Sequence, residues 1–238
     1  MFHNGEKMAK QESLHDIPRR FPVVIEDNIL YWMRNSHDSE IRGVVSFQGR
    51  VDKDRLFRAV RLCMDAEPIL GCRFKKRFFR SYWERMDDLD NAVSSELVET
   101  SKYDDDIGSF LTSLPPLNLF TGPQVKVWIL RSKHDKIVFK FQHVTGDGAA
   151  NADYARLLSE IYTKLGENPD YRPVPNINGT RSLNQVGSNF SFKDKYGIVS
   201  RGMKDIAHFM TPVKYMIYPF GTSERSGLTM MISPVEPE

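Results

Sequence analysis

Alternating apolar and polar positions predict paired strands in the middle of the chain. Along residues 136–143 the odd positions are mainly apolar and end on a histidine, which is typical of a strand with one buried face. An apolar run over 125–130 precedes it. The short polar segment 131–135 between the two runs predicts a hairpin.

Helical spacing appears in three other segments. The strongest covers 149–165 and is expected to end at Gly166; its apolar face is Tyr154, Leu157, Leu158, Ile161 and Leu165. A second helix is predicted over 52–67, with Asp52 as N-cap and Leu56, Ala59, Val60 and Cys63 on its inner face. A third is expected within 23–33, with Ile25, Ile29 and Trp32 on one face.

The remaining elements are shorter. Strands are expected at 41–47 and 97–98, a strand-turn-strand unit at 71–86, and a late strand at 228–232. A short helix is expected within 103–114, entered through three aspartates. Together these elements predict an α/β (α+β) fold, a two-layer sandwich in which a mixed β-sheet packs against helices.

Composition narrows the class of protein. The 238 residues include 33 Lys and Arg against 31 Asp and Glu, a balance that argues against a dedicated nucleic-acid binder. Two cysteines exclude a disulfide scaffold and a four-cysteine zinc site. The sequence has neither a membrane-spanning apolar run nor the apolar core of a signal peptide near its start, so we expect a cytoplasmic protein.

Residues 142–148 read Gln-His-Val-Thr-Gly-Asp-Gly and carry the candidate chemistry. His143 is expected at the end of a strand with an apolar approach, a setting that suits a general base near neutral pH. Asp147 is expected to fix the following turn or pair with an arginine, and Gly148 to give that turn conformational freedom. The other interpretation of His143 is a hydrogen-bonded structural histidine at a strand end.

This stretch resembles the His-His-x-x-x-Asp-Gly motif of the chloramphenicol acetyltransferase and condensation-domain superfamily, which includes alcohol O-acetyltransferases. In the resemblance, His143 takes the place of the second, catalytic histidine, and Asp147 and Gly148 take the places of the aspartate and glycine. Gln142 stands where the first histidine would be, a departure that weakens the condensation-domain comparison more than the general acyltransferase one. The resemblance covers residues 20 to about 232 and implies a chloramphenicol acetyltransferase-like fold.

The resemblance implies two similar halves, and this chain looks like the first. We expect a polar flexible tail over 1–18, a half-domain carrying the motif over 19–168, and a linker and crossover segment over 169–238. A partner half-domain or self-association would complete the substrate channel. The sequence leaves three roles open for the methionine-rich segment 203–231: it is part of the core, it lines an acyl channel, or it covers the surface where the second half would pack.

The implied reaction is acyl transfer from a coenzyme A or phosphopantetheinyl carrier thioester, acting as co-substrate, to an alcohol or amine. No tightly bound cofactor or metal is expected. The alternative function is a non-catalytic half-domain, either a binding and interaction module or a truncated product. It is favoured by Gln142 and by the missing half.

Three other groups of candidate residues are better explained by structural roles than by chemistry. The basic and aromatic residues of 73–85 could contact nucleic acid or phosphates, but a solvated hairpin face gives the same pattern. Asp104, Asp105 and Asp106 suit a helix start better than a metal site. Cys63 is expected in the core and not as a nucleophile.

Overall fold

The computed structural model describes residues 17–34, 39–77, 80–146 and 148–177, with the isolated residues 191, 196, 197, 200 and 201. The chain divides into two compact units, Met1–Gly179 and Thr180–Glu238. All of the helices and strands discussed below belong to the first unit. Most of the predicted tail, the predicted strand 228–232, all of the methionine-rich segment 203–231 and Asp147 lie outside the described residues.

A four-stranded mixed sheet forms the centre of the first unit, in the order β2-β7-β6-β5. Its strands are β2 (Glu40–Ser46), β5 (Ser95–Glu99), β6 (Val125–Arg131) and β7 (Asp135–Gln142). Strand β7 pairs antiparallel with both β2 and β6, whereas β5 runs parallel to β6. The predicted hairpin and the mixed character of the sheet are therefore confirmed.

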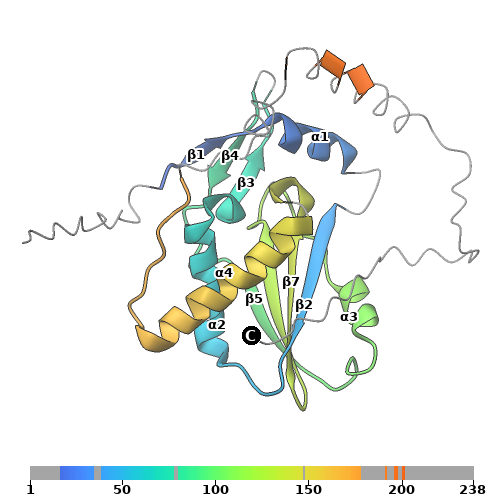
Figure 1. Ribbon diagram of the computed structural model, residues 1–238, viewed down its shortest axis with the longest axis vertical. Helices are drawn as coiled ribbons and strands as arrows, with labels where there is room; N and C mark the ends of the chain where they lie inside the picture. Colours follow the sequence, from blue (N-terminus) through green and yellow to red (C-terminus); the bar gives the residue numbers. More distant parts are fainter. Residues whose placement is uncertain are drawn as a thin grey trace, which may run out of the picture. The chain divides into compact units, whose positions relative to one another are not determined.

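Helices α2 (Lys53–Ala66) and α4 (Gly148–Glu167) lie side by side over one face of this sheet (Figure 1). The sheet supplies alternate apolar residues such as Val127, Ile129 and Phe139, and these pack with the buried faces of both helices. This is the two-layer arrangement that the sequence predicts. Helix α4 runs through Gly166, so the expectation that this glycine ends the helix is wrong by one residue.

Start and stop signals for α2 act as the sequence indicates. The Asp52 side chain accepts a hydrogen bond from the Arg55 N–H at 3.1 Å, which satisfies one of the free donors of the first turn. Leu56, Ala59, Val60 and Cys63 are all buried. A 3-10 helix, η2 (Pro68–Gly71), then turns the chain into the next strand.

A second, three-stranded sheet has the order β1-β4-β3. Its β3-β4 pair confirms the strand-turn-strand unit predicted over 71–86, whereas the pairing of β1 was not predicted. It consists of β1 (Arg20–Pro22), β3 (Cys72–Lys75) and β4 (Tyr82–Arg85), all antiparallel. Its inner face buries Phe74 and Trp83. Helix α1 (Ile25–Met33) lies beside this sheet in Figure 1 and contributes Tyr31, whose ring stacks on Phe74 at 4.9 Å between centroids.

The predicted face of α1 is wrong. Ile25 and Trp32 are 73% and 71% exposed, and the buried residues of the helix are Asp27 and Tyr31. The Asp27 carboxylate accepts a hydrogen bond from the Trp83 indole N–H at 2.8 Å, which explains how an acidic side chain can be buried there.

Helix α3 (Ile107–Ser113) lies on the connection from β5 to β6. Asp106 caps it by accepting from the Ser109 N–H at 3.1 Å, as the acidic run predicts. The segment that follows α3 crosses the sheet face opposite α2 and α4. Lys140 of β7 donates there to the carbonyl of Pro115 at 2.6 Å.

Candidate functional site

His143 directly follows the last residue of β7 and lies at the junction between the two sheets. The last residue pair of the β2-β7 ladder is Glu40 with Gln142, and His143 then begins a 3-10 turn, η3 (His143–Thr145). The strand therefore ends one residue earlier than predicted. The backbone N–H of His143 still donates to the Ser39 carbonyl at 2.8 Å, so the turn remains attached to the start of β2.

The η3 turn is fixed on its other side by the small sheet. Val144 is 2% exposed and belongs to the apolar cluster that contains Tyr31, Phe74 and Trp83. The Thr145 hydroxyl donates to the Gln142 carbonyl at 2.7 Å. The backbone at His143 is therefore set by contacts to both sheets.

The His143 side chain is partly exposed. Its Nδ1 atom is buried and has no hydrogen-bond partner among the described residues. A buried polar atom without a partner is uncommon, and a catalytic role is one of the explanations for it. An imidazole in this setting can accept or donate a proton through either ring nitrogen, depending on its tautomer.

Gln142, which stands where the resembled motif has its first histidine, has a structural role. Its side chain is 5% exposed, and its amide nitrogen donates to the Leu117 carbonyl at 2.7 Å. Its backbone N–H donates to the Gln124 carbonyl at 3.0 Å. These bonds attach the segment after α3 to the end of β7, directly before His143.

A buried charged network continues this attachment and was not predicted from the sequence. Lys140 is fully buried, and its ammonium lies 2.7 Å from a Glu40 carboxylate oxygen. The same carboxylate lies 3.4 Å from the Arg42 guanidinium, and it accepts a hydrogen bond from the Leu117 N–H. Alternation along β7 identifies Lys140 as facing away from the helices, but nothing local identifies Glu40 as its partner.

Gly146 permits a close approach where the chain passes from η3 toward α4. An added Cβ would lie 2.7 Å from the Ala150 Cβ, closer than real Cβ contacts. Gly148, expected to give this turn conformational freedom, is the first residue of α4. The smallness of Gly146, which lies in the same short motif, was the signal that could have found it.

The remaining candidates are structural in the described part of the chain. Cys63 is fully buried, and this burial raises the pKa of its thiol, as expected for a core residue. Asp104 accepts from the Ser132 hydroxyl at 2.6 Å. Among the residues that the structure describes, no three His, Cys, Asp or Glu side chains form a group that could hold a metal ion, and no helix is long and apolar enough to cross a membrane.

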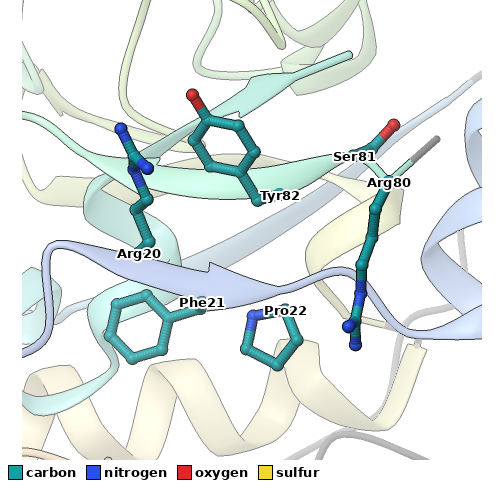
Figure 2. Close-up of a pocket in the computed structure, with 6 residues that line it drawn as sticks. All are labelled: Arg20, Phe21, Pro22, Arg80, Ser81 and Tyr82. Atoms are coloured by element: carbon teal, nitrogen blue, oxygen red, sulfur yellow. The ribbon is translucent and has the colours of Figure 1, made fainter. Parts of the chain in front are cut away.

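The hollows on the surface of the first unit include the following two. One lies at the edge of the small sheet, beside β1 and β4 (Figure 2). The other lies between the start of α2 and the end of α4, where Arg55, Leu165 and Pro169 are among its lining residues. His143 is not among the residues that line either hollow.

No family model matches the sequence, and no curated protein matches it. Solved structures do match. Polyketide synthase associated protein 5 from Mycobacterium tuberculosis has a TM-score of 0.53 at 12% identity, over 71% of this chain and 39% of that one. The starter condensation domain of rhizomide synthetase RzmA has a TM-score of 0.52 at 16% identity, over 80% and 47%. The complex of the X-domain and OxyB from teicoplanin biosynthesis gives 0.55 at 15%, over 69% and 38%.

These likenesses show the fold, which is of the condensation-domain, chloramphenicol acetyltransferase-like type. More particularly, the described chain has the form of one half of such a domain, since it spans less than half the length of the chains just named. The fold that the motif implied is therefore confirmed. At identities this low, the comparisons carry no residue roles.

Proposed function

We propose that this chain is an acyltransferase, or the N-terminal half of one, and that His143 is its general base. The acyl donor is a thioester of coenzyme A or of a phosphopantetheinyl carrier protein, and it acts as a co-substrate. The acceptor is an alcohol or an amine. The observation that carries the proposal is His143 itself, held at the junction of two sheets in a condensation-type fold with a shielded Nδ1.

In this mechanism a nitrogen of the neutral imidazole takes the proton of the acceptor hydroxyl or amine as that group attacks the thioester carbonyl. The carbon–sulfur bond then breaks, and the imidazolium returns the proton to the leaving thiolate. No covalent acyl-enzyme forms. Asp147 lies outside the described residues and keeps, in this proposal, the loop-fixing role that the motif implies. Gly148 begins α4, whereas Gln142 supports the site through its bond to the Leu117 carbonyl.

The test is thiol release from acyl-coenzyme A in the presence of pooled alcohol and amine acceptors. General acid–base catalysis contributes about 10²–10⁴-fold, so His143→Ala is expected to lower turnover by at least about 100-fold. The matched control is His134→Ala, because His134 is exposed in the β6-β7 turn. Turnover that is unchanged in His143→Ala would show that the mechanism is wrong.

A second candidate is a non-catalytic half-domain that acts as a binding or interaction module. It is favoured by the half-length match. Binding of acyl-coenzyme A without thiol release, in both the wild type and His143→Ala, would support this module and contradict catalysis.

A further inference from the structure

The second half of strand β2 is an exposed strand edge that carries no charge. Strand β2 lies at the border of the large sheet, where β7 is its one neighbour among the described strands (Figure 1). Residues 43–49 read Gly-Val-Val-Ser-Phe-Gln-Gly. Val44 and Val45 are each 36% exposed, and Phe47 is 40% exposed. An open, apolar strand edge is a surface on which another strand can pair.

The other sheet edges in the described part of the chain carry charge or proline. Strand β5, at the far border of the large sheet, contains Glu96 and Glu99. In the small sheet, β1 contains Arg20 and Pro22, and β3 ends on Lys75. Charged residues and prolines at an edge oppose pairing with other chains, so the uncharged half of β2 is an exception.

The hydrogen-bond pattern shows which backbone groups of β2 point away from β7. The Phe47 N–H donates to the Asp135 carbonyl at 2.9 Å, and the Ser39 carbonyl accepts from the His143 N–H at 2.8 Å. Both pairs continue the β2-β7 register, in which bonded and non-bonded pairs alternate. The odd-numbered positions of β2 therefore bond to β7, and the backbone groups of the even-numbered positions point outward.

The first outward groups are covered and the later ones are open. The Arg42 carbonyl accepts from the Asn151 side chain of α4 at 3.4 Å. At Val44 and Ser46, no hydrogen bond from the described residues reaches the backbone N–H or C=O groups. These two residues thus present two donors and two acceptors on an exposed edge, the arrangement that an added strand satisfies.

We propose that two copies of this chain pair through β2, antiparallel and about a two-fold axis at Val45. In this register Val44 of each copy lies opposite Ser46 of the other, so all four outward groups on each copy gain partners. Val45 meets its counterpart in a non-hydrogen-bonded pair, in which opposite side chains approach most closely. The contact is self-complementary, as a two-fold interface between identical chains requires.

The charges that flank the segment fit a second copy in this orientation. The uncharged stretch is bounded by Arg42 on one side and Arg50 on the other. Antiparallel order sends Arg50 toward the Glu40 end of the second copy, whereas parallel order would set Arg42 against Arg42. Like charges directly opposite one another destabilise a strand pair, so antiparallel order is favoured. This surface goes beyond acyl transfer and stands without it, because it does not use His143.

The first experiment is sedimentation velocity on the full chain over a micromolar dilution series. We expect the mass to rise with concentration from that of one chain toward that of two. Ser46→Pro removes an outward N–H and no bond to β7, and proline is tolerated on edge strands, so it should raise the dimer Kd at least tenfold. Ser46→Ala keeps the N–H and is the matched control, with the Kd of the wild type.

A charge exchange at Val45 tests the register itself. Val45→Lys sets two ammonium groups opposite each other, and Val45→Glu sets two carboxylates, so each variant alone should be monomeric. A mixture of the two should form a heterodimer, because opposite charges then face each other across the two-fold axis. Thermal melts of the separate variants check that the fold is retained.

A wild-type chain that stays monomeric throughout the series would overturn the proposal. Amide hydrogen exchange at Val44 and Ser46 then identifies the alternative: protection in the monomer would mean that another segment of this chain covers the edge, and fast exchange would mean an edge left for a different protein. An unchanged Kd in Ser46→Pro, or a Val45→Lys and Val45→Glu mixture that does not associate, would also overturn it. His143→Ala should dimerise as the wild type does, which separates this surface from the catalytic proposal.

Discussion

Replacing Lys140 by Met tests whether the buried network beside Gln142 stabilises the fold. Methionine keeps most of the length of the side chain and removes the ammonium. The substitution breaks the 2.7 Å ion pair to Glu40 and the 2.6 Å hydrogen bond to the Pro115 carbonyl. Glu40 keeps the Arg42 guanidinium at 3.4 Å and the Leu117 N–H, so its carboxylate retains partial compensation.

The magnitude follows from burial. Removing one partner of a buried ion pair costs about 3–5 kcal/mol, because it leaves the other charge desolvated. Arg42 still partly compensates the charge of Glu40, so the loss of stability in Lys140→Met should lie near the lower end of this range, at about 3 kcal/mol. With a urea dependence of about 2 kcal/mol per molar, the unfolding midpoint should fall by about 1.5 M.

The assay is urea unfolding of the full chain, followed by tryptophan fluorescence and far-ultraviolet circular dichroism. Lys126→Met is the matched control, because Lys126 lies directly opposite Lys140 in the β6-β7 register. Its partner Glu96 is half exposed, and the pair is 3.1 Å apart. Exposed pairs contribute about 0–1 kcal/mol, so the control should lose little stability.

A double-mutant cycle separates the ion pair from general packing. Lys140→Met/Glu40→Leu removes both charges, so the double variant should be more stable than the sum of the single losses by about 2 kcal/mol. Additive losses, or equal losses in Lys140→Met and Lys126→Met, would refute the reasoning that burial makes this pair costly to break.

Two further predictions concern other buried polar groups. Desolvation acts to raise the pKa of Asp135, but the Arg131 and Val51 hydrogen bonds lower it overall; its stabilisation should therefore be present above the unfolded value of about 3.9 and be lost as pH falls below it. Asp135→Asn should cost about 2–3 kcal/mol at pH 7, and the cost measured by urea unfolding should shrink as the pH falls from the unfolded value through the lowered folded-state pKa. A cost that stays constant down to complete protonation would contradict this. Cys63 and Cys72 should not react with a thiol-specific chromogenic reagent in the native chain but should both react in urea, because both are fully buried. Rapid labelling of Cys63 in the native chain would show that this thiol is accessible and not buried in the core.

Local signals predicted most helices and strands. Asp52 and Pro68 bracket α2 because a cap and a proline act on the nearest turn of backbone, whatever the rest of the chain does. The β6-β7 hairpin is local in the same sense, since a three-residue connection brings the strands together. His143 was a candidate site residue because it follows one of these local elements.

Local signals could not predict which distant segments pair with one another. The third strand of the small sheet, β1, pairs with β4 and brings Arg20 opposite Glu84. Hydrophobic periodicity describes single elements, so it cannot predict which of two distant segments pair. The same applies to α1, where spacing favoured Ile25 and Trp32 as the inner face. Its buried side is instead the one on which Asp27 accepts a hydrogen bond from Trp83.

The position of His143 depends on two sheets at once, and this is what distinguishes it from an ordinary strand-end histidine. Its backbone N–H is held by Ser39 beside the large sheet, whereas the next side chain, Val144, is packed in the apolar cluster of the small sheet. A residue held from only one side can swing with the loop that follows. Because contacts from both directions meet within two consecutive residues, the backbone that carries the imidazole is placed by packed structure, which is part of the preorganisation that the proposed general base requires.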